Sequence, residues 1–171
     1  MDLRAYIRDI PDFPKPGIVF KDITPLFLAP EALEHAIGAL AAHAREREAD
    51  YVVSAEARGF VLGGAMAAAA GAGFVLARKP GKLPREVDSV EYQLEYGVDA
   101  LEVHADAVSG GSRVLVHDDL LATGGTAEAL CGLVERAGGV VAGCAFVIEL
   151  GFLGGRERLA DYDVHSLVVY E

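Results

Sequence analysis

The sequence is poor in cysteine, in strongly apolar runs and in positive charge. Its two cysteines, Cys131 and Cys144, lack the spacing of metal ligands, and two cysteines alone make no disulfide framework. We interpret them as reduced thiols of the core, which predicts a cytoplasmic protein.

Nothing in the chain predicts a membrane protein. The first ten residues, MDLRAYIRDI, form a charged amphipathic stretch without the apolar core of a signal peptide. The uncharged run of residues 61–77 is mostly Ala and Gly and is broken at residues 71–73. A membrane span usually needs about 20 strongly apolar residues, so we expect a buried helix followed by a strand.

The charge balance restricts the class of partner. Lys and Arg number 15 against 26 Asp and Glu, a formal net charge of −11. This balance argues against nucleic acid or an anionic membrane as a general partner, and any polyanionic ligand has to find a local basic pocket. The 171 residues suit one domain with a substantial core, and we find neither an internal repeat nor a second domain.

The most informative stretch is VLVHDDLLATGGTAE, residues 114–128. An apolar, β-branched run is followed by two acids, a loop of small residues at 122–126 and a helix-forming run. Glycine N–H groups, the Thr123 and Thr126 hydroxyls and a helix N-terminus together predict an anion-binding loop after a parallel strand. The Lys of a P-loop and the three-glycine Rossmann pattern are both missing.

Two acids, Asp118 and Asp119, directly precede this loop. Carboxylates there would repel a phosphate, but they can accept hydrogen bonds from the vicinal hydroxyls of a sugar a few ångströms away. A ribose 5-phosphate meets both demands. The competing interpretation of these residues is an ordinary strand-to-helix turn.

Basic side chains that can bind an anion occur at two further places along the chain. Arg58 lies between a predicted strand at residues 51–54 and a glycine-initiated helix, where its planar fork suits a bidentate anion. Residues 78–85 contain four basic side chains and no acid, punctuated by Pro and Gly. We interpret this segment as a loop that closes over a ligand rather than as a solvated face.

Strands that alternate with helices predict an α/β fold with a central parallel sheet flanked by helices and ligands at the carboxyl ends of the strands. At the N-terminus we expect a short helical stripe at residues 3–10 and an ordered, irregular Pro-rich loop whose apolar residues 13 and 18–20 are buried. We interpret four of the five histidines as structural. The other expected elements are helices at 31–48, 127–137 and 156–159, strands at 74–77, 140–150 and 164–169, and a hairpin of 90–96 with 100–104.

The run DDLLATGGT at residues 118–126 resembles the phosphoribosyl pyrophosphate (PRPP) signature of type I phosphoribosyltransferases. Further stretches resemble the adenine phosphoribosyltransferases of that family. They follow in order along the chain as IPDFPKPGIVFKDITPL at 10–26, EARGF at 56–60, RKPGKLP at 78–84 and LEYG at 94–97. Chance agreement spread over so much of the chain is improbable.

The resemblance implies purine salvage, in which adenine and PRPP give AMP and pyrophosphate. It implies the type I phosphoribosyltransferase fold in a single domain, residues 1–171, with an N-terminal segment at 1–30 and a hood with a flexible loop at 79–104. It also implies a homodimer and a Mg²⁺ cofactor. The metal would be carried by PRPP with no direct protein ligand, reaching Asp118 or Asp119 at most through water.

The resemblance assigns roles to individual residues. Glu95 would handle the purine proton, with Arg58 and Lys82 as the other catalytic groups and a cis peptide at Glu56-Ala57. The remaining substrate-binding residues would be Val19, Phe20 and Lys21 at the adenine, Tyr96 over the site, Arg78 at the pyrophosphate, Asp118 and Asp119 at the ribose, and Leu121, Ala122, Thr123, Gly124, Gly125 and Thr126 at the phosphate. His117 and Pro80 depart from the family, which usually has an aliphatic and frequently a basic residue there. His117 either packs on Asp118 and affects its charge or is an inert strand residue, which we favour.

Three alternatives remain open. The chain could transfer phosphoribose to guanine, hypoxanthine or xanthine instead of adenine. A non-catalytic PRPP-binding regulator on the same fold is disfavoured because it needs a DNA-binding module. A Rossmann-type nucleotide binder is disfavoured by the missing glycine pattern.

Overall fold

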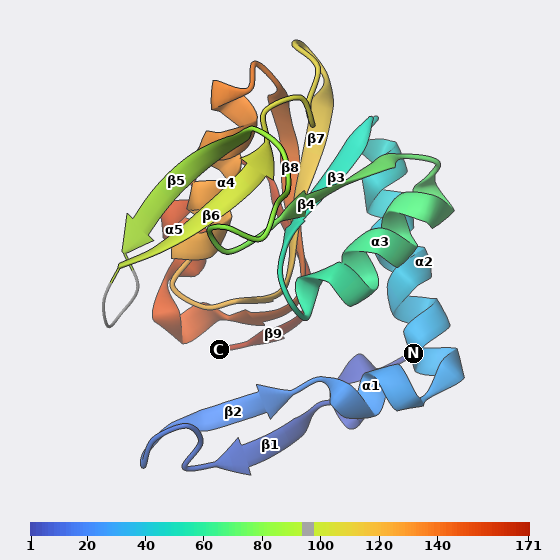
Figure 1. The fold of residues 1–171 in the computed structure, drawn as a ribbon. Coiled ribbons are helices and arrows are strands. Elements are labelled where there is room, and N and C mark those ends of the chain that lie inside the picture. The colour runs from blue at the N-terminus through green and yellow to red at the C-terminus, as the bar shows by residue number, and fades with distance from the viewer. Residues whose placement is uncertain (94–97) are drawn as a thin grey trace.

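The computed structural model describes residues 1–93 and 98–171 and has a five-stranded parallel sheet at its centre (Figure 1). The strands lie in the order β4-β3-β7-β8-β9, with every neighbouring pair parallel. This confirms the α/β class that the sequence predicts. The bounds are β3 (Tyr51–Ala55), β4 (Gly73–Ala77), β7 (Arg113–Leu121), β8 (Val140–Leu150) and β9 (Val164–Tyr170).

Helices cover both faces of the sheet. Because successive side chains of a strand point to opposite faces, Val52 packs in the core cluster that contains α2 and α3 residues, whereas Val53 packs in the cluster that contains α4 residues. The strands are therefore mainly apolar on both faces, as is typical of a parallel sheet buried on both sides. The helices are α1 (Thr24–Leu28), α2 (Pro30–Glu46), α3 (Gly59–Ala70), α4 (Gly125–Arg136) and α5 (Gly155–Arg158), with 3-10 turns η1 (Leu3–Tyr6) and η2 (Gly151–Leu153).

Two small antiparallel sheets lie outside the central sheet (Figure 1). The hairpin of β5 (Val87–Gln93) and β6 (Val98–His104) is the one that the sequence predicts, and it packs beside α4. The second hairpin, β1 (Arg8–Pro11) and β2 (Val19–Asp22), lies below the carboxyl edge of the sheet in Figure 1.

The N-terminal hairpin corrects three expectations. A helical stripe at residues 3–10 is wrong, because the helix ends at Tyr6 and a strand begins at Arg8. The Pro-rich segment is not wholly irregular either, since Pro11 ends a two-stranded sheet, where a missing N–H is tolerated. The apolar residues of this segment were expected to be buried, but three of them are exposed, namely Phe13 (51%), Ile18 (39%) and Val19 (47%).

The order of the strands places the site. β3 is followed in sequence by β4 on one side of it, while its other neighbour is β7, so the direction of winding changes between β3 and β7. Ligands of open parallel sheets bind outside the carboxyl ends of the strands at such a point. No helix in the described part of the chain is long and apolar enough to cross a membrane.

The close packing of α3 on the sheet gives a test of the fold. A Cβ at Gly63 would lie 2.9 Å from Phe74 Cε2 and 3.1 Å from Ser54 Cβ, whereas a Cβ at Gly38 in α2 would meet nothing within 4 Å. Gly63→Ala should therefore lower the free energy of unfolding by about 1–3 kcal/mol. Gly38→Ala should raise it by about 0.5–1 kcal/mol, because alanine favours a helix. Urea unfolding of both variants measures the two signs, and a stabilised Gly63→Ala would contradict the tight contact.

Candidate active site

A cavity of about 230 Å³ opens where β7 passes into α4. It is lined by Arg58, Phe146 and residues 118–127, which include the whole predicted anion-binding loop. Leu121 contributes here with its backbone, because its side chain is 1% exposed and belongs to the core. The structure thus brings the doubled acid and the loop together around one space, although both acids lie within β7 rather than after it.

The loop owes its shape to Gly124. This residue has φ of 83°, a left-handed conformation that favours glycine, and it begins α4 without a side-chain cap. A Cβ there would also lie 2.8 Å from the Gly155 carbonyl oxygen. The first N–H groups of a helix have no partner within it, so those of α4 are available to an anion at the cavity, where the helix dipole adds to the attraction.

Arg58 joins the two strands at the winding change. It follows β3, and its Nε donates a 2.5 Å hydrogen bond to Asp119 Oδ2 in an ion pair. A second cavity of about 210 Å³ shares Arg58, Asp118, Asp119 and Thr126 with the first, so the two spaces adjoin. The Glu56-Ala57 peptide, which precedes Arg58 and lines the second cavity, is cis, which confirms the expectation from the family resemblance.

The two carboxyls of the doubled acid differ in environment. Burial, together with the charge of Asp119, raises the pKa of Asp118 well above its usual value, while Arg58 acts in the opposite direction. Asp118 Oδ1 accepts a 2.9 Å hydrogen bond from the Asp119 N–H. The site therefore holds one carboxylate with a cation partner and one whose ionisation costs free energy.

The basic loop after β4 is held by one acid. Glu56 accepts hydrogen bonds from the Lys79 N–H at 2.5 Å and from Lys82 Nζ at 3.1 Å to each oxygen, with Arg78 Nη2 at 3.4 Å. Burial alone would raise the pKa of Glu56, but these donors together hold the pKa below its usual value. Arg78 and Lys82 thereby lie against Glu56, which lines the second cavity together with Lys79.

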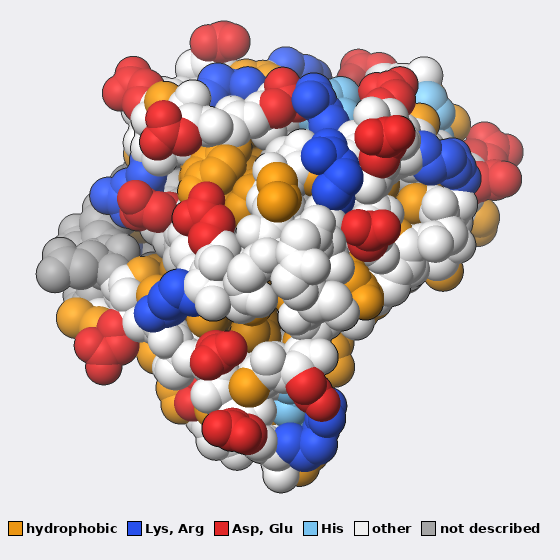
Figure 2. Space-filling model, turned by 90° about the horizontal axis from the view of Figure 1, so that it is seen from above, with side chains coloured by type: hydrophobic (Ala, Val, Ile, Leu, Met, Phe, Trp, Pro, Cys, Tyr) orange, Lys and Arg blue, Asp and Glu red, His pale blue; other side chains and the backbone are white. Residues whose placement is uncertain are grey.

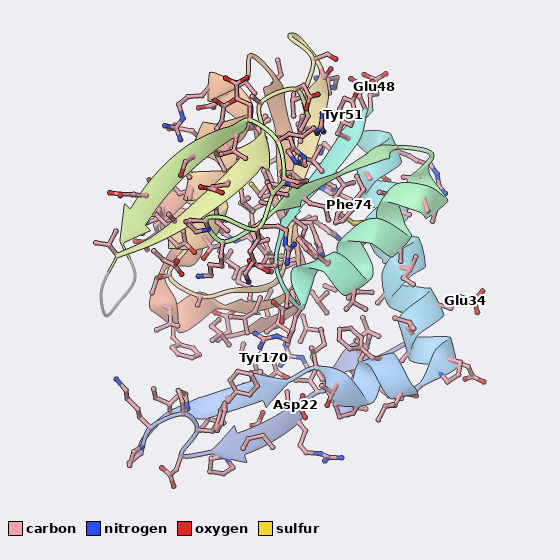
Figure 3. All side chains as sticks on the ribbon, viewed as in Figure 1. Asp22, Glu34, Glu48, Tyr51, Phe74 and Tyr170 are labelled. Carbon is pink, nitrogen blue, oxygen red and sulfur yellow. The ribbon has the colours of Figure 1, made fainter. Side chains whose placement is uncertain are left out.

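The predicted adenine residues come from the N-terminal hairpin. The guanidinium of Arg58 lies over the Phe20 ring at 5.4 Å from its centroid, which links this hairpin to the cavities. Lys21 Nζ pairs with Asp9 at 2.7 Å and lies 4.0 Å from the centroid of the Tyr170 ring. Figure 3 labels Tyr170 between the hairpin and the central sheet. Val19 is half exposed beside them.

His117 differs from the family pattern, which usually has an aliphatic residue at this position. It is fully buried, its Nδ1 donates to the Ala145 carbonyl oxygen at 2.9 Å, and burial lowers its pKa to about 4. The imidazole is thus neutral near pH 7. Glu95 and Tyr96, predicted for the purine side, lie outside the described residues.

Sequence reasoning missed four polar or aromatic residues that line the cavities. Glu56, Lys79 and Tyr92 line the second cavity, and Phe146 lines the first. For Glu56 a signal existed, because an acid two residues before a predicted anion-binding Arg has no ordinary structural purpose. Tyr92 and Phe146 look like alternating and buried strand residues, so their sequence pattern predicts only packing.

Comparisons with known proteins agree with this geometry. The Phosphoribosyl transferase domain family model matches residues 27–168. The chain is therefore a member of the phosphoribosyltransferases, and its fold is the one this family shares. The adenine phosphoribosyltransferase of Rubrobacter xylanophilus is 63% identical over 169 residues, covering 98% of this chain and 91% of the relative.

Solved structures of adenine phosphoribosyltransferases also match this chain. The crystal structure of adenine phosphoribosyltransferase from Thermoanaerobacter pseudethanolicus matches with a TM-score of 0.95 at 51% identity, covering 98% of both chains. The Saccharomyces cerevisiae enzyme, complexed with an imino-altritol bisphosphate and adenine, matches with 0.92 at 40% identity, covering 96% of both. This chain belongs to the adenine phosphoribosyltransferase family.

The buried Asp118 yields a prediction on stability. The pKa of Asp118 is raised in the folded protein. Its contribution to the free energy of unfolding is therefore fully present below the pKa of the unfolded chain, near 3.8, and is lost as the pH rises through the folded pKa. Asp118→Asn should therefore be more stable than the native chain at pH 7, by about 1 kcal/mol or more. Thermal unfolding at several pH values measures this difference, which should vanish near pH 3.5. Exposed Asp161→Asn serves as the control, and a pH-independent difference would contradict the prediction.

Proposed function

We propose that this chain acts in purine salvage by converting adenine and PRPP to AMP and pyrophosphate. The observation that carries the proposal is the pair of adjoining cavities at the β3–β7 edge, which unites an anion-binding loop, two carboxylates and Arg58. Its relatives named adenine phosphoribosyltransferase, matched over nearly the full chain, support adenine as the base.

The ribose and its phosphate occupy the first cavity in this proposal. Residues 121–126 bind the 5-phosphate through backbone N–H groups and the Thr123 and Thr126 hydroxyls. Asp118 and Asp119 accept hydrogen bonds from the ribose hydroxyls. As pyrophosphate leaves, the anomeric carbon becomes cationic, and the carboxylates stabilise this charge more in the transition state than in the ground state.

The leaving group is bound from the other side. Arg58, Arg78 and Lys82 accept the charge that develops on pyrophosphate. Adenine N9 forms the new bond to the anomeric carbon, and Glu95 handles the purine proton. Tyr96 covers the site.

Adenine lies against the N-terminal hairpin. Phe20 lies close to the ring, and the backbone of Val19 and Lys21 reads the adenine edge, which presents a donor amine beside an acceptor nitrogen. In support, β2 is hydrogen-bonded only to β1 within the described residues, so alternate backbone groups on its other side face away from that pairing.

Mg²⁺ fits the residues present. Carboxylate oxygens are ligands that this ion prefers, and Asp118 and Asp119 supply them at the cavity. No group of three or more His, Cys, Asp or Glu among the described residues is arranged to hold a metal. We propose that PRPP carries the ion, which neutralises pyrophosphate charge, and that it reaches these carboxylates through water.

We further propose a single-domain, cytoplasmic homodimer. Exposed Phe13, Ile18 and Val19 on one hairpin are the kind of apolar surface that a second copy covers. Sedimentation should find twice the chain mass of 18.0 kDa, and a monomer at micromolar concentration would contradict this part.

The base preference is tested by turnover with PRPP and each of adenine, guanine, hypoxanthine and xanthine. We expect AMP from adenine and at least about 100-fold lower kcat/KM for the other bases, because their edges leave the backbone groups of Val19 and Lys21 unpaired in the complex. Equal turnover with guanine or hypoxanthine would favour the alternative purine enzyme. No turnover, combined with PRPP-dependent DNA retention, would favour the regulator.

The role of Arg58 is tested by Arg58→Ala. Loss of one electrostatic contact to the leaving group should lower kcat/KM by about 100- to 1,000-fold. Arg45→Ala is the matched control, because Arg45 donates to the Ala69 carbonyl oxygen on the α2–α3 side, away from the cavities. Near-full turnover of Arg58→Ala would contradict the role assigned to Arg58. Near-full turnover of Glu95→Ala would likewise contradict the role assigned to Glu95.

A further inference from the structure

Among the described residues, Glu56 is the one acid that forms ion pairs with both cations assigned to pyrophosphate from the basic loop. Its carboxylate receives Lys82 Nζ at 3.1 Å on both oxygens and Arg78 Nη2 at 3.4 Å on one. The Glu56 side chain is 11% exposed, whereas those of Arg78 and Lys82 are 34% and 47% exposed. The acid is therefore the fixed member of the cluster, and the cations are the members with room to turn.

The backbone fixes Glu56 further. Its N–H donates to the Ala77 carbonyl oxygen at 3.0 Å, and its carboxylate accepts the Lys79 N–H. These two bonds connect the residue after β3 to the last residue of β4 and to the segment that follows β4. Glu56 thus holds the start of the basic loop beside the cavity that also contains Arg58 and Asp118.

A pyrophosphate in this cavity needs the same donors that Glu56 uses. Each N–H bond to the carboxylate has to be exchanged for a bond to a phosphoryl oxygen, and the remaining carboxylate repels the incoming anion. The low pKa of Glu56 keeps the side chain ionised near pH 7, so the repulsion persists under working conditions.

We infer that Glu56 is a positioning residue that sets the affinity for pyrophosphate, because it holds Arg78 and Lys82 at the cavity and competes with pyrophosphate for them. The inference rests on the proposed assignment of these two cations. Competition from Glu56 weakens the binding of pyrophosphate, which favours its release as a product. After pyrophosphate departs, the cations return to a carboxylate rather than to water.

Glu56→Gln tests this competition, because the amide keeps an acceptor for the Lys79 N–H but lacks the charge. Calorimetric titration with inorganic pyrophosphate and magnesium chloride should show about 3- to 10-fold tighter binding, since partly exposed charge pairs contribute on the order of 1 kcal/mol. The KM for PRPP should fall as well, without a rise in kcat.

Glu102→Gln is the matched control. It removes one negative charge from the same region, but its carboxylate accepts the Gly81 N–H at 3.0 Å, a backbone group rather than a site cation. Pyrophosphate affinity should stay within about twofold of the native value in this variant. Glu56→Asp retains the charge and should bind pyrophosphate with the native affinity.

Unchanged or weaker pyrophosphate binding by Glu56→Gln would overturn the inference and leave Glu56 with a purely structural role. Equal tightening by Glu56→Asp or Glu102→Gln would overturn it too, because the effect would then not come from the Glu56 charge. Failure of the proposed function is a separate result, since native protein would then make no AMP from adenine and PRPP.

Discussion

The ion pair of Arg58 with Asp119 ties together the two strands on which the site depends. Arg58 follows β3 and Asp119 lies near the end of β7, and these neighbours run parallel in register. Parallel pairing brings their carboxyl ends to one edge, so residues 61 positions apart in sequence meet within 2.5 Å. The cavities on either side of this pair then receive the loop before α4 and the segment after β4.

The same edge explains how an acidic protein can bind a polyanion. Figure 2 shows the end of the molecule that lies opposite the carboxyl edge of the central sheet. Acidic and basic side chains are interspersed there, without one broad field of either sign. At the site, by contrast, each cation is held by a particular carboxylate: Asp119 holds Arg58, Glu56 holds Arg78 and Lys82, and Asp99 holds Lys79. Held in this way, the cations keep their places without a net positive surface, and their affinity for an anion depends on how readily each carboxylate gives them up.

Sequence patterns predicted the central fold and half of the site for a physical reason. The apolar strand, doubled acid, glycine loop and helix at residues 114–128 are local, and local geometry follows from local residue types. Contacts across strands are different, because no spacing in the sequence says that Glu56 receives Lys82 or that Tyr92 faces Thr126. The β1–β2 hairpin was missed because prolines mask strand periodicity, and its apolar residues were misjudged because exposure depends on what lies opposite.

The N-terminal hairpin is held more loosely than the loop before α4, which continues the central sheet. An isolated two-stranded hairpin is marginally stable in water, and β1–β2 pairs with no third strand in the described chain. Its side-chain links to the body include Lys21 over Tyr170 and Phe20 under Arg58. Arg58 contacts both Asp119 and the Phe20 ring, so a shift of this one side chain changes an ion pair at the cavities and a contact of the hairpin at the same time. Under the proposed assignments, that shared side chain couples the binding of the leaving group to the purine side of the site.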